Sequence, residues 1–257
     1  MSRVLQELRA QLDHCDAQLL RHFRKRMAII QEVAAYKKEH RLPIYDPQRE
    51  EEILARYEES EQEFFRTLLR LSRFEQSLVL FPYTIVLIGF MGVGKSSVGA
   101  QLAQHLGREF LDLDQILEGR LGMPIAEFFA RHGEVAFRQE ESLLLAELTP
   151  LRGVVIATGG GAVLDPQNVA ALRQQGPLVL LTAEPQTIST RLAGDRTRPV
   201  LAERATVEGI AELLAERQPV YEQVAQVTIR TDQLRVQEVV TAVLRSLAQA
   251  DDKLASF

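Results

Sequence analysis

The chain has 257 residues, of which 46% are hydrophobic and 25% charged, and a formal net charge of −5. This length and composition allow a globular protein with one large domain or two modest ones. The chain lacks the basic excess of nucleic-acid-binding proteins and any run of about 18 apolar residues, so we expect neither a nucleic-acid partner nor a membrane. Its one cysteine, Cys15, cannot form an internal disulfide, and the charged N-terminus is unlike a signal peptide, which together favour the cytoplasm.

The first forty residues have the pattern of one long helix. Leu5, Leu12 and Leu19 recur every seven residues, and Arg26 occupies the next position of this series. A buried guanidinium is unfavourable unless it is paired, so we expect an anionic ligand or a buried carboxylate beside Arg26. Lys37 follows Arg26 by eleven residues, about three helical turns, which predicts that the two cations lie on one face.

Two further helices are predicted before Pro82. Asp46 is suited to be the N-cap of the second, with Pro47 in its first turn, and Pro82 ends the third. The third helix is marked by Phe64, Leu68, Leu71 and Leu78.

Arg9 lies seventeen residues before Arg26, about 25 Å along a straight helix, so both can serve one ligand only if a second subunit supplies Arg9. From periodicity alone, a coiled-coil dimerisation stalk with solvated charges is the favoured alternative.

From Thr84 onward, short β-branched segments alternate with helical segments. This alternation predicts a five-stranded parallel sheet with helices on both faces, in an α/β domain of residues 82–257 that follows an all-α domain of residues 1–81. The expected strands are residues 84–88, 109–112, 153–158, 177–182 and 226–231. The expected helices are residues 95–106, 115–121, 124–131, 134–148, 167–174, 185–193, 206–224 and 234–248.

A P-loop follows the first of these strands. Residues 89–96, Gly-Phe-Met-Gly-Val-Gly-Lys-Ser, fit G-x-x-x-x-G-K-[ST] between a predicted strand and a predicted helix, the context in which this motif binds phosphates. The glycines let backbone N–H groups approach the phosphates, and the helix offers its positive N-terminus. Lys95 adds a positive charge, and Ser96 is placed to hold Mg²⁺. The motif therefore predicts binding of a nucleoside triphosphate.

Three further motifs suggest ligand groups, although each has a simpler explanation. Asp112 and Asp114 end the second strand, where one carboxylate can reach Mg²⁺ through water and the other can accept a proton from a hydroxyl; alternatively, Asp114 merely caps the next helix. Residues 159–161 are three glycines, which permit close approach to a ligand or form a simple tight turn. Arg138, in the sequence Phe-Arg-Gln-Glu-Glu, could clamp a carboxylate or be a solvated surface residue.

In their order and spacing these motifs, with Arg-Pro-Val-Leu at 198–201, resemble shikimate kinase over residues 84–248. The resemblance implies that Asp114 takes the proton of the shikimate 3-hydroxyl, that Lys95 contacts the β- and γ-phosphates, and that Arg198 contacts the transferring phosphoryl group from a lid. It implies a Mg²⁺ site at Ser96 and Asp112. The implied ATP-binding residues are Gly89, Gly92, Val93, Gly94, Lys95, Ser96, Ser97, Arg191 and Arg198. The implied shikimate-binding residues are Asp114, Arg138, Gly159, Gly160, Gly161 and Arg217.

The first domain resembles the all-helical class of chorismate mutase, an intertwined dimer of three-helix chains. The resemblance rests on Leu-x-x-Leu-Arg9, on Arg26 with Lys37, on Asp46-x-x-Arg49-Glu50 and on Ser72-Arg73-x-x-Gln76. It implies that Lys37 and Gln76 contact the ether oxygen of chorismate. The implied chorismate-binding residues are Arg9 (from the partner), Arg26, Lys37, Asp46, Arg49, Glu50, Ser72 and Gln76. The segment between Glu50 and Phe65 is about ten residues shorter than is usual for that family.

The sequence therefore predicts a homodimeric bifunctional enzyme that uses ATP and Mg²⁺ to phosphorylate shikimate and converts chorismate to prephenate. One alternative keeps the kinase, for shikimate or a related small metabolite such as gluconate, with a helical domain that serves only dimerisation or regulation. Another is a nucleotide-dependent switch without catalysis, which explains the P-loop but not the other motifs.

Overall fold

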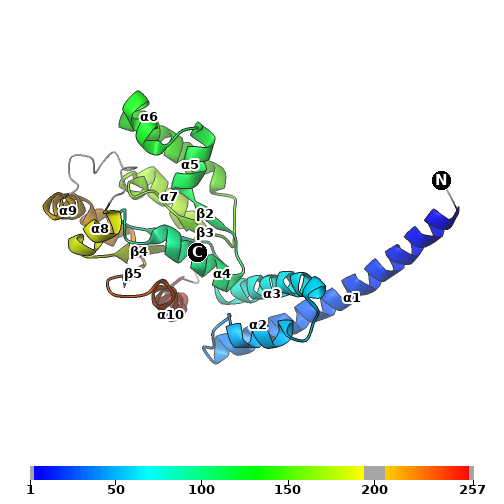
Figure 1. Ribbon diagram of the computed structural model, residues 1–257. Coiled ribbons are helices and arrows are strands. Elements are labelled where there is room, and N and C mark those ends of the chain that lie inside the picture. The colour runs from blue at the N-terminus through cyan, green and yellow to red at the C-terminus, as the bar shows by residue number, and fades with distance from the viewer. Residues whose placement is uncertain (1–2, 194–205, 255–257) are drawn as a thin grey trace. The chain divides into compact units, whose positions relative to one another are not determined.

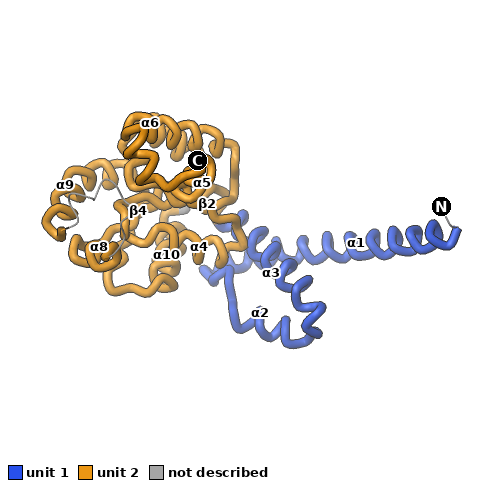
Figure 2. The backbone as a smooth tube through the Cα atoms, turned by 45° about the horizontal axis from the view of Figure 1, so that its top comes forward, with its two compact units in different colours: residues 1–80 blue, residues 81–257 orange. Residues whose placement is uncertain are grey.

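The computed structural model describes residues 3–193 and 206–254 and divides into two compact units, residues 1–80 and 81–257 (Figure 2). The first unit is entirely helical, and the second is an α/β structure (Figure 1). The all-α and α/β classes predicted from the two patterns are confirmed.

The helical unit consists of α1 (Arg3–Glu39), α2 (Pro47–Leu54) and α3 (Glu59–Leu80). Helix α3 packs along α1, and α2 packs against α3. Asp46 is the N-cap of α2, as expected: its Oδ1 accepts a hydrogen bond from the Arg49 N–H at 3.0 Å, and Pro47 takes the first turn, where a missing N–H costs nothing.

This unit has a very small hydrophobic core. Among its described residues only Ala34, Ile44 and Leu69 are buried hydrophobic side chains. The leucine series of α1 is not packed within the chain, since Leu5, Leu12 and Leu19 are 41%, 63% and 58% exposed. In a single chain, this helix of 37 residues therefore exposes an apolar stripe to solvent, and burying that stripe against another apolar surface would stabilise it.

The second unit is built on one five-stranded parallel sheet in the order β2-β3-β1-β4-β5. All five predicted strands are confirmed. They are β1 (Ile85–Ile88), β2 (Phe110–Asp112), β3 (Val155–Ala157), β4 (Leu178–Thr182) and β5 (Val227–Arg230). The central strand β1 is buried at every position, as is typical of a parallel sheet covered on both faces.

Helices connect the strands and cover the sheet. Helix α4 packs against β1, β2 and β3 and also against α10, which packs on β5, so α4 and α10 share one face. The later crossovers run in the opposite direction across the sheet and therefore lie on the other face, where α9 packs against β4. These helices are α4 (Lys95–Leu106), α5 (Leu113–Leu121), α6 (Ile125–Leu148), α7 (Pro166–Gln175), α8 (Pro185–Leu192), α9 (Val207–Val224) and α10 (Val236–Leu254).

Two of the longer helices, α6 and α10, compare with the expected helices as follows. The helices expected at residues 124–131 and 134–148 are both present and follow one another in α6, where Gly133, with a φ of 80° and a ψ of 172°, breaks the helical backbone between them. Helix α10 continues to Leu254, beyond the expected end at residue 248. No helix in the described part of the chain is long and apolar enough to cross a membrane.

Candidate functional site

The P-loop connects β1 to α4 with backbone geometry that requires glycine. Gly89 has a φ of 132°, and a Cβ atom there would lie 2.3 Å from the backbone oxygen of Leu181 in the neighbouring strand. Gly94, with a φ of 102°, is the N-cap of α4, so Lys95 and Ser96 stand at the start of that helix. The Lys95 ammonium folds back over the P-loop and donates to the carbonyl oxygens of Gly89 and Phe90 at 2.8 and 2.9 Å.

Arg191, one of the implied ATP-binding residues, joins the P-loop to the residue that follows β5. Its guanidinium donates to the backbone oxygens of Gly92 and Val93 at 3.4 and 3.3 Å, and to the hydroxyl and carbonyl oxygens of Thr231 at 2.9 Å each. Thr231 follows β5 and is buried, and its hydroxyl also donates to Val93 O at 3.0 Å. Sequence reasoning missed Thr231, since nothing in its local pattern distinguishes it from an ordinary strand-end threonine.

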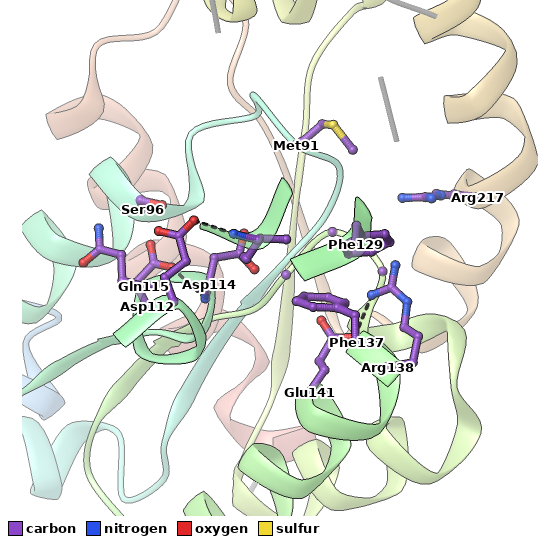
Figure 3. A pocket seen from close by; sticks show the side chains of 15 residues that line it. Met91, Ser96, Asp112, Asp114, Gln115, Phe129, Phe137, Arg138, Glu141 and Arg217 are labelled. Atoms are coloured by element: carbon purple, nitrogen blue, oxygen red, sulfur yellow. Dashed lines mark hydrogen bonds and ion pairs between the residues drawn. The ribbon is translucent and has the colours of Figure 1, made fainter. Parts of the chain in front are cut away.

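A cavity of about 220 Å³ lies at the carboxyl ends of β1, β2 and β3 (Figure 3). This is the edge where parallel α/β sheets hold their ligands. Residues from the P-loop, the β2–α5 segment, α6, the three glycines and α9 line the cavity, and among them are eight of the predicted site residues. These are Ser96, Asp112, Asp114, Arg138, Gly159, Gly160, Gly161 and Arg217. The cavity also contains groups that were not predicted: Met91, Gln115, Glu118, Ile125, Phe129, Phe137 and Glu141.

Arg138 is not a solvated surface residue. Its Nη1 donates to Glu141 Oε2 at 2.7 Å (Figure 3), and its Nη2 donates to Glu134 Oε1 at 3.2 Å. Burial lowers the pKa of Arg138, but the charge and hydrogen bond of Glu141, with help from Glu134, outweigh it and leave that pKa raised. The guanidinium is therefore charged and held at the cavity wall.

Glu141 is the most deeply buried carboxyl group of the cavity, with 1% of its surface exposed. Burial raises its pKa, and the charge of Arg138 opposes that shift. Its Oε1 has no hydrogen-bond partner among the described atoms, an uncommon state for a buried carboxylate oxygen. The spacing Arg138-x-x-Glu141 was the available signal for this residue, because side chains three apart on a helix are neighbours.

Two of the three glycines, Gly159 and Gly161, allow side chains to approach the backbone more closely than any Cβ would permit. A Cβ on Gly159 would lie 2.6 Å from Glu141 Oε1 and 2.8 Å from Asp114 Oδ1. A Cβ on Gly161 would lie 2.4 Å from the Arg138 guanidinium. The glycines thus make room for three charged side chains of the cavity, which the reading as a simple tight turn does not explain.

Arg217 reaches the same cavity from α9 (Figure 3). It is buried, and its guanidinium lies 5.9 Å from the centre of the Phe90 ring. One turn further along α9, the Tyr221 hydroxyl donates to the carbonyl oxygen of Gly160. Burial raises the pKa of Tyr221, while the neighbouring Arg217 acts in the opposite direction. Tyr221 therefore stays neutral and ties α9 to the glycine turn.

The two aspartates after β2 have different positions. Asp112 is the N-cap of α5, where its Oδ1 accepts from the backbone N–H groups of Asp114 and Gln115 at 3.1 and 3.4 Å. The alternative in which Asp114 is the cap is therefore wrong, because Asp114 lies within the first turn of the helix and its side chain lines the cavity. Arg198, expected on a lid, lies outside the described residues.

In the helical unit, the predicted residues of α1 and α3 meet. Arg26 is half-buried and donates to Ser72 Oγ and to the carbonyl oxygen of Leu68 at 3.4 Å. Its partners are thus a hydroxyl and a carbonyl rather than the buried carboxylate considered above. Burial lowers the pKa of Arg26. Gln76, one turn after Ser72, is buried; its amide nitrogen donates to Ser72 O at 3.0 Å, while its Oε1 has no hydrogen-bond partner in the described structure.

Lys37 and Glu50 complete this cluster. The Lys37 ammonium donates to Ile44 O at 2.8 Å, and burial lowers its pKa against the opposing charges of Asp46 and Glu50. Glu50 accepts from the guanidinium of Arg73, a pair that sequence reasoning did not assign to the site. Arg49 is not brought to the cluster, since it pairs with Glu52 at 3.0 Å on the exposed side of α2.

These arrangements define the second unit as a P-loop kinase whose acceptor cavity has two arginines and an aspartate, and the first as a three-helix domain with a cationic cluster. A family model for shikimate kinase matches residues 91–248, and one for chorismate mutase type II matches residues 8–79. The chain belongs to the shikimate kinase family and carries a chorismate mutase domain before the kinase domain. Both resemblances predicted from the sequence are confirmed.

The kinase unit is similar to many curated shikimate kinases. It is 42% identical to one from Pelotomaculum thermopropionicum over 165 residues, which are 64% of this chain and 95% of that protein. It is 45% identical to one from Desulforudis audaxviator over 166 residues, 64% of this chain and 86% of that protein. Among solved structures, a shikimate kinase from Acinetobacter baumannii in complex with shikimate aligns with a TM-score of 0.63 and 38% identity, covering 65% of this chain and 93% of that one.

Proposed function

We propose that the chain is a bifunctional enzyme that transfers the γ-phosphoryl group of ATP to the 3-hydroxyl of shikimate and rearranges chorismate to prephenate. The observation that carries the kinase assignment is the single cavity that contains Asp114, Arg138, Arg217 and the glycine turn beside Ser96 of the P-loop. A carboxylate near a P-loop serine suits a hydroxyl acceptor, and two arginines suit an acceptor that carries a carboxylate.

In this proposal Arg138 and Arg217 hold the shikimate carboxylate, and Glu141 orients Arg138. Asp114 orients the 3-hydroxyl and accepts its proton as the oxygen attacks the γ-phosphorus. Lys95 leaves the carbonyl oxygens of Gly89 and Phe90 to contact the β- and γ-phosphates. Gly89, Gly92, Val93, Gly94, Ser96 and Ser97 cradle the phosphates, Arg191 lies beside the adenine, and Arg198 contacts the transferring group.

Magnesium fits the residues present. Ser96 and Asp112 line the same cavity, and a hydroxyl, one carboxylate, phosphate oxygens and water are the hard oxygen ligands that Mg²⁺ prefers. Asp112 uses one oxygen for the α5 N-cap, which orients its carboxylate. When bound, the ion would neutralise phosphate charge and align the leaving group.

For the mutase, we propose that Arg26 and the partner subunit's Arg9 bind the two carboxylates of chorismate, while Lys37 and Gln76 stabilise charge that develops on the ether oxygen. Asp46, Glu50 and Ser72 complete the site, and Arg49 joins them by turning from Glu52 when chorismate binds. Arg9 lies on the exposed part of α1, seventeen residues before Arg26, and the exposed leucines of that helix need an apolar partner. A homodimer through the helical domain supplies both. The one cysteine suits a cytoplasmic enzyme.

The decisive experiment is to assay the purified chain for ATP-dependent phosphorylation of shikimate and for loss of chorismate. Lys95→Ala should abolish the first and spare the second, and Lys37→Ala should do the reverse, so each variant controls for the folding of the other. Loss of both activities in either variant would contradict independent sites. A wild-type chain that phosphorylates shikimate but leaves chorismate unchanged would show the helical domain to be catalytically silent.

A further inference from the structure

Arg73 of α3 is a buried cation beside the chorismate-binding cluster. Its side chain is 11% exposed, and its Nη1 donates to both carboxylate oxygens of Glu50, which is 20% exposed. The guanidinium also lies over the ring of Tyr45, 5.0 Å from the ring centre. Contacts to α2 and to the segment before it thus fix this side chain on two sides, as is typical of a guanidinium that orients another group.

The hydrogen-bonding capacity of Arg73 is not fully used in this position. Its Nε is buried and has no hydrogen-bond partner in the described structure. An arginine retained only to stabilise the three-helix packing would be expected to use this donor, because a buried unpaired N–H is unfavourable. The geometry of Arg73 is instead directed toward one carboxylate, that of Glu50.

Glu50 lies among cations from two helices. Arg73 contacts Glu50 from α3. Burial lowers the pKa of Lys37 on α1, and the negative charge of Glu50 opposes this shift. Asp46, the N-cap of α2, is the other carboxylate that acts on Lys37. Without Arg73, two carboxylates would share one ammonium group in a site that has to accept a substrate with two carboxylates of its own.

We propose that Arg73 is a positioning residue of the mutase site, which neutralises Glu50 and holds its carboxylate so that dianionic chorismate can bind beside Lys37. This role rests on the mutase activity proposed above. Arg73 acts through Glu50 and Lys37 and does not contact the reacting atoms. Like-charge repulsion in a partly buried site is strong enough to dominate binding, because water screens it poorly.

The test is a double-mutant cycle on Arg73→Met and Glu50→Gln in the full chain, with kcat and KM for chorismate as readouts. Arg73→Met keeps an unbranched stem that reaches to about the position of Nε, and it removes the charged guanidinium. The loss of a charged hydrogen bond predicts a fall in kcat/KM of roughly ten- to a hundredfold, mostly through a higher KM. Adding Glu50→Gln to Arg73→Met should recover part of this loss, because it removes the carboxylate left without its partner.

Arg70→Met is the matched control, since it makes the same substitution at an exposed position of the same helix. It should leave kcat/KM within about twofold of wild type. Thermal unfolding and solution mass report on folding and assembly; if Arg73→Met fails these, Arg73→Lys and Arg73→Gln replace it, and only the lysine variant should retain most of the affinity. A purely structural role predicts equal losses for lysine and glutamine and no recovery by Glu50→Gln.

Two outcomes separate this role from the function on which it rests. A wild-type chain without chorismate turnover would refute the mutase function and the role of Arg73 with it. A wild-type chain with turnover, together with a folded Arg73→Met variant of unchanged kcat/KM or a cycle in which the two substitutions add independently, would refute the role of Arg73 alone.

Discussion

Gly161→Ala tests the argument that the glycine turn exists to admit the charged side chains of the kinase cavity. The added Cβ would lie 2.4 to 2.5 Å from three atoms of the Arg138 guanidinium. An ordinary van der Waals contact begins near 3.4 Å, so the guanidinium has to move by roughly 1 Å. The backbone at Gly161, with φ of −105° and ψ of −7°, is one that alanine adopts without strain.

The expected result is a loss of shikimate affinity with little change in stability. Moving Arg138 weakens one or two charged hydrogen bonds, each worth about 1.5–3 kcal/mol, which corresponds to a KM for shikimate roughly ten- to a hundredfold higher. Only the end of a flexible side chain is displaced, so the melting temperature should stay within about 4 °C of wild type. Steady-state kinetics with shikimate varied at saturating ATP measure the first quantity, and thermal unfolding measures the second.

Alanine substitutions at two other glycines serve as controls with opposite expected outcomes. Gly119→Ala lies on the exposed side of α5 with no atom within 4 Å of the added Cβ, so it should leave KM unchanged. Gly89→Ala places its Cβ 2.3 Å from a backbone oxygen at a positive φ, so it should lose stability as well as ATP binding. A folded Gly161→Ala enzyme whose KM for shikimate is within about twofold of wild type would refute the reasoning.

The remaining predictions concern charge, assembly and metal. Because the pKa of Glu141 is raised above its ordinary value of 4.5, the folded state holds this proton more tightly than the unfolded chain, and ionisation of Glu141 lowers stability as the pH rises through that window. The unfolding free energy of Glu141→Gln relative to wild type should therefore increase between about pH 4 and pH 7 in urea titrations, and a difference that is independent of pH would contradict the raised pKa. Mixed Arg9→Ala and Lys37→Ala chains, each inactive as a mutase alone, should recover about a quarter of wild-type mutase activity after random exchange, since half the dimers then have one intact site of two; verified exchange without recovery would count against a shared site. Removal of Mg²⁺ with EDTA should stop phosphorylation of shikimate and leave chorismate turnover unchanged, and equal loss of both would argue against a metal site confined to Ser96 and Asp112.

Local sequence patterns determined most of the secondary structure. Prolines mark the end of α1, the start of α2 and the end of α3, and Asp46 caps α2 as its residue type favours. In the second unit, alternating apolar segments predicted each of the five strands, because a parallel sheet buried on both faces selects continuous β-branched runs. The two helices expected on either side of Gly133 are also present within α6, because a glycine at this positive φ breaks the helical backbone.

The sequence also determined which residues are candidates for the kinase site, because the P-loop, the aspartates after β2, the glycine turn and Arg138 are each tied to one strand end or one helix start. Only the tertiary structure decided their partners. Tyr221 and Thr231 act across elements distant in the chain, and a hydrogen bond from Tyr221 to Gly160 leaves no local pattern in either segment. The role of Arg73 was likewise not predictable from its local sequence, because it depends on Glu50, which lies opposite it on another helix. Periodicity and capping are properties of neighbouring residues, whereas the pairing of buried charges is a property of which elements pack together, and that is decided by the fold.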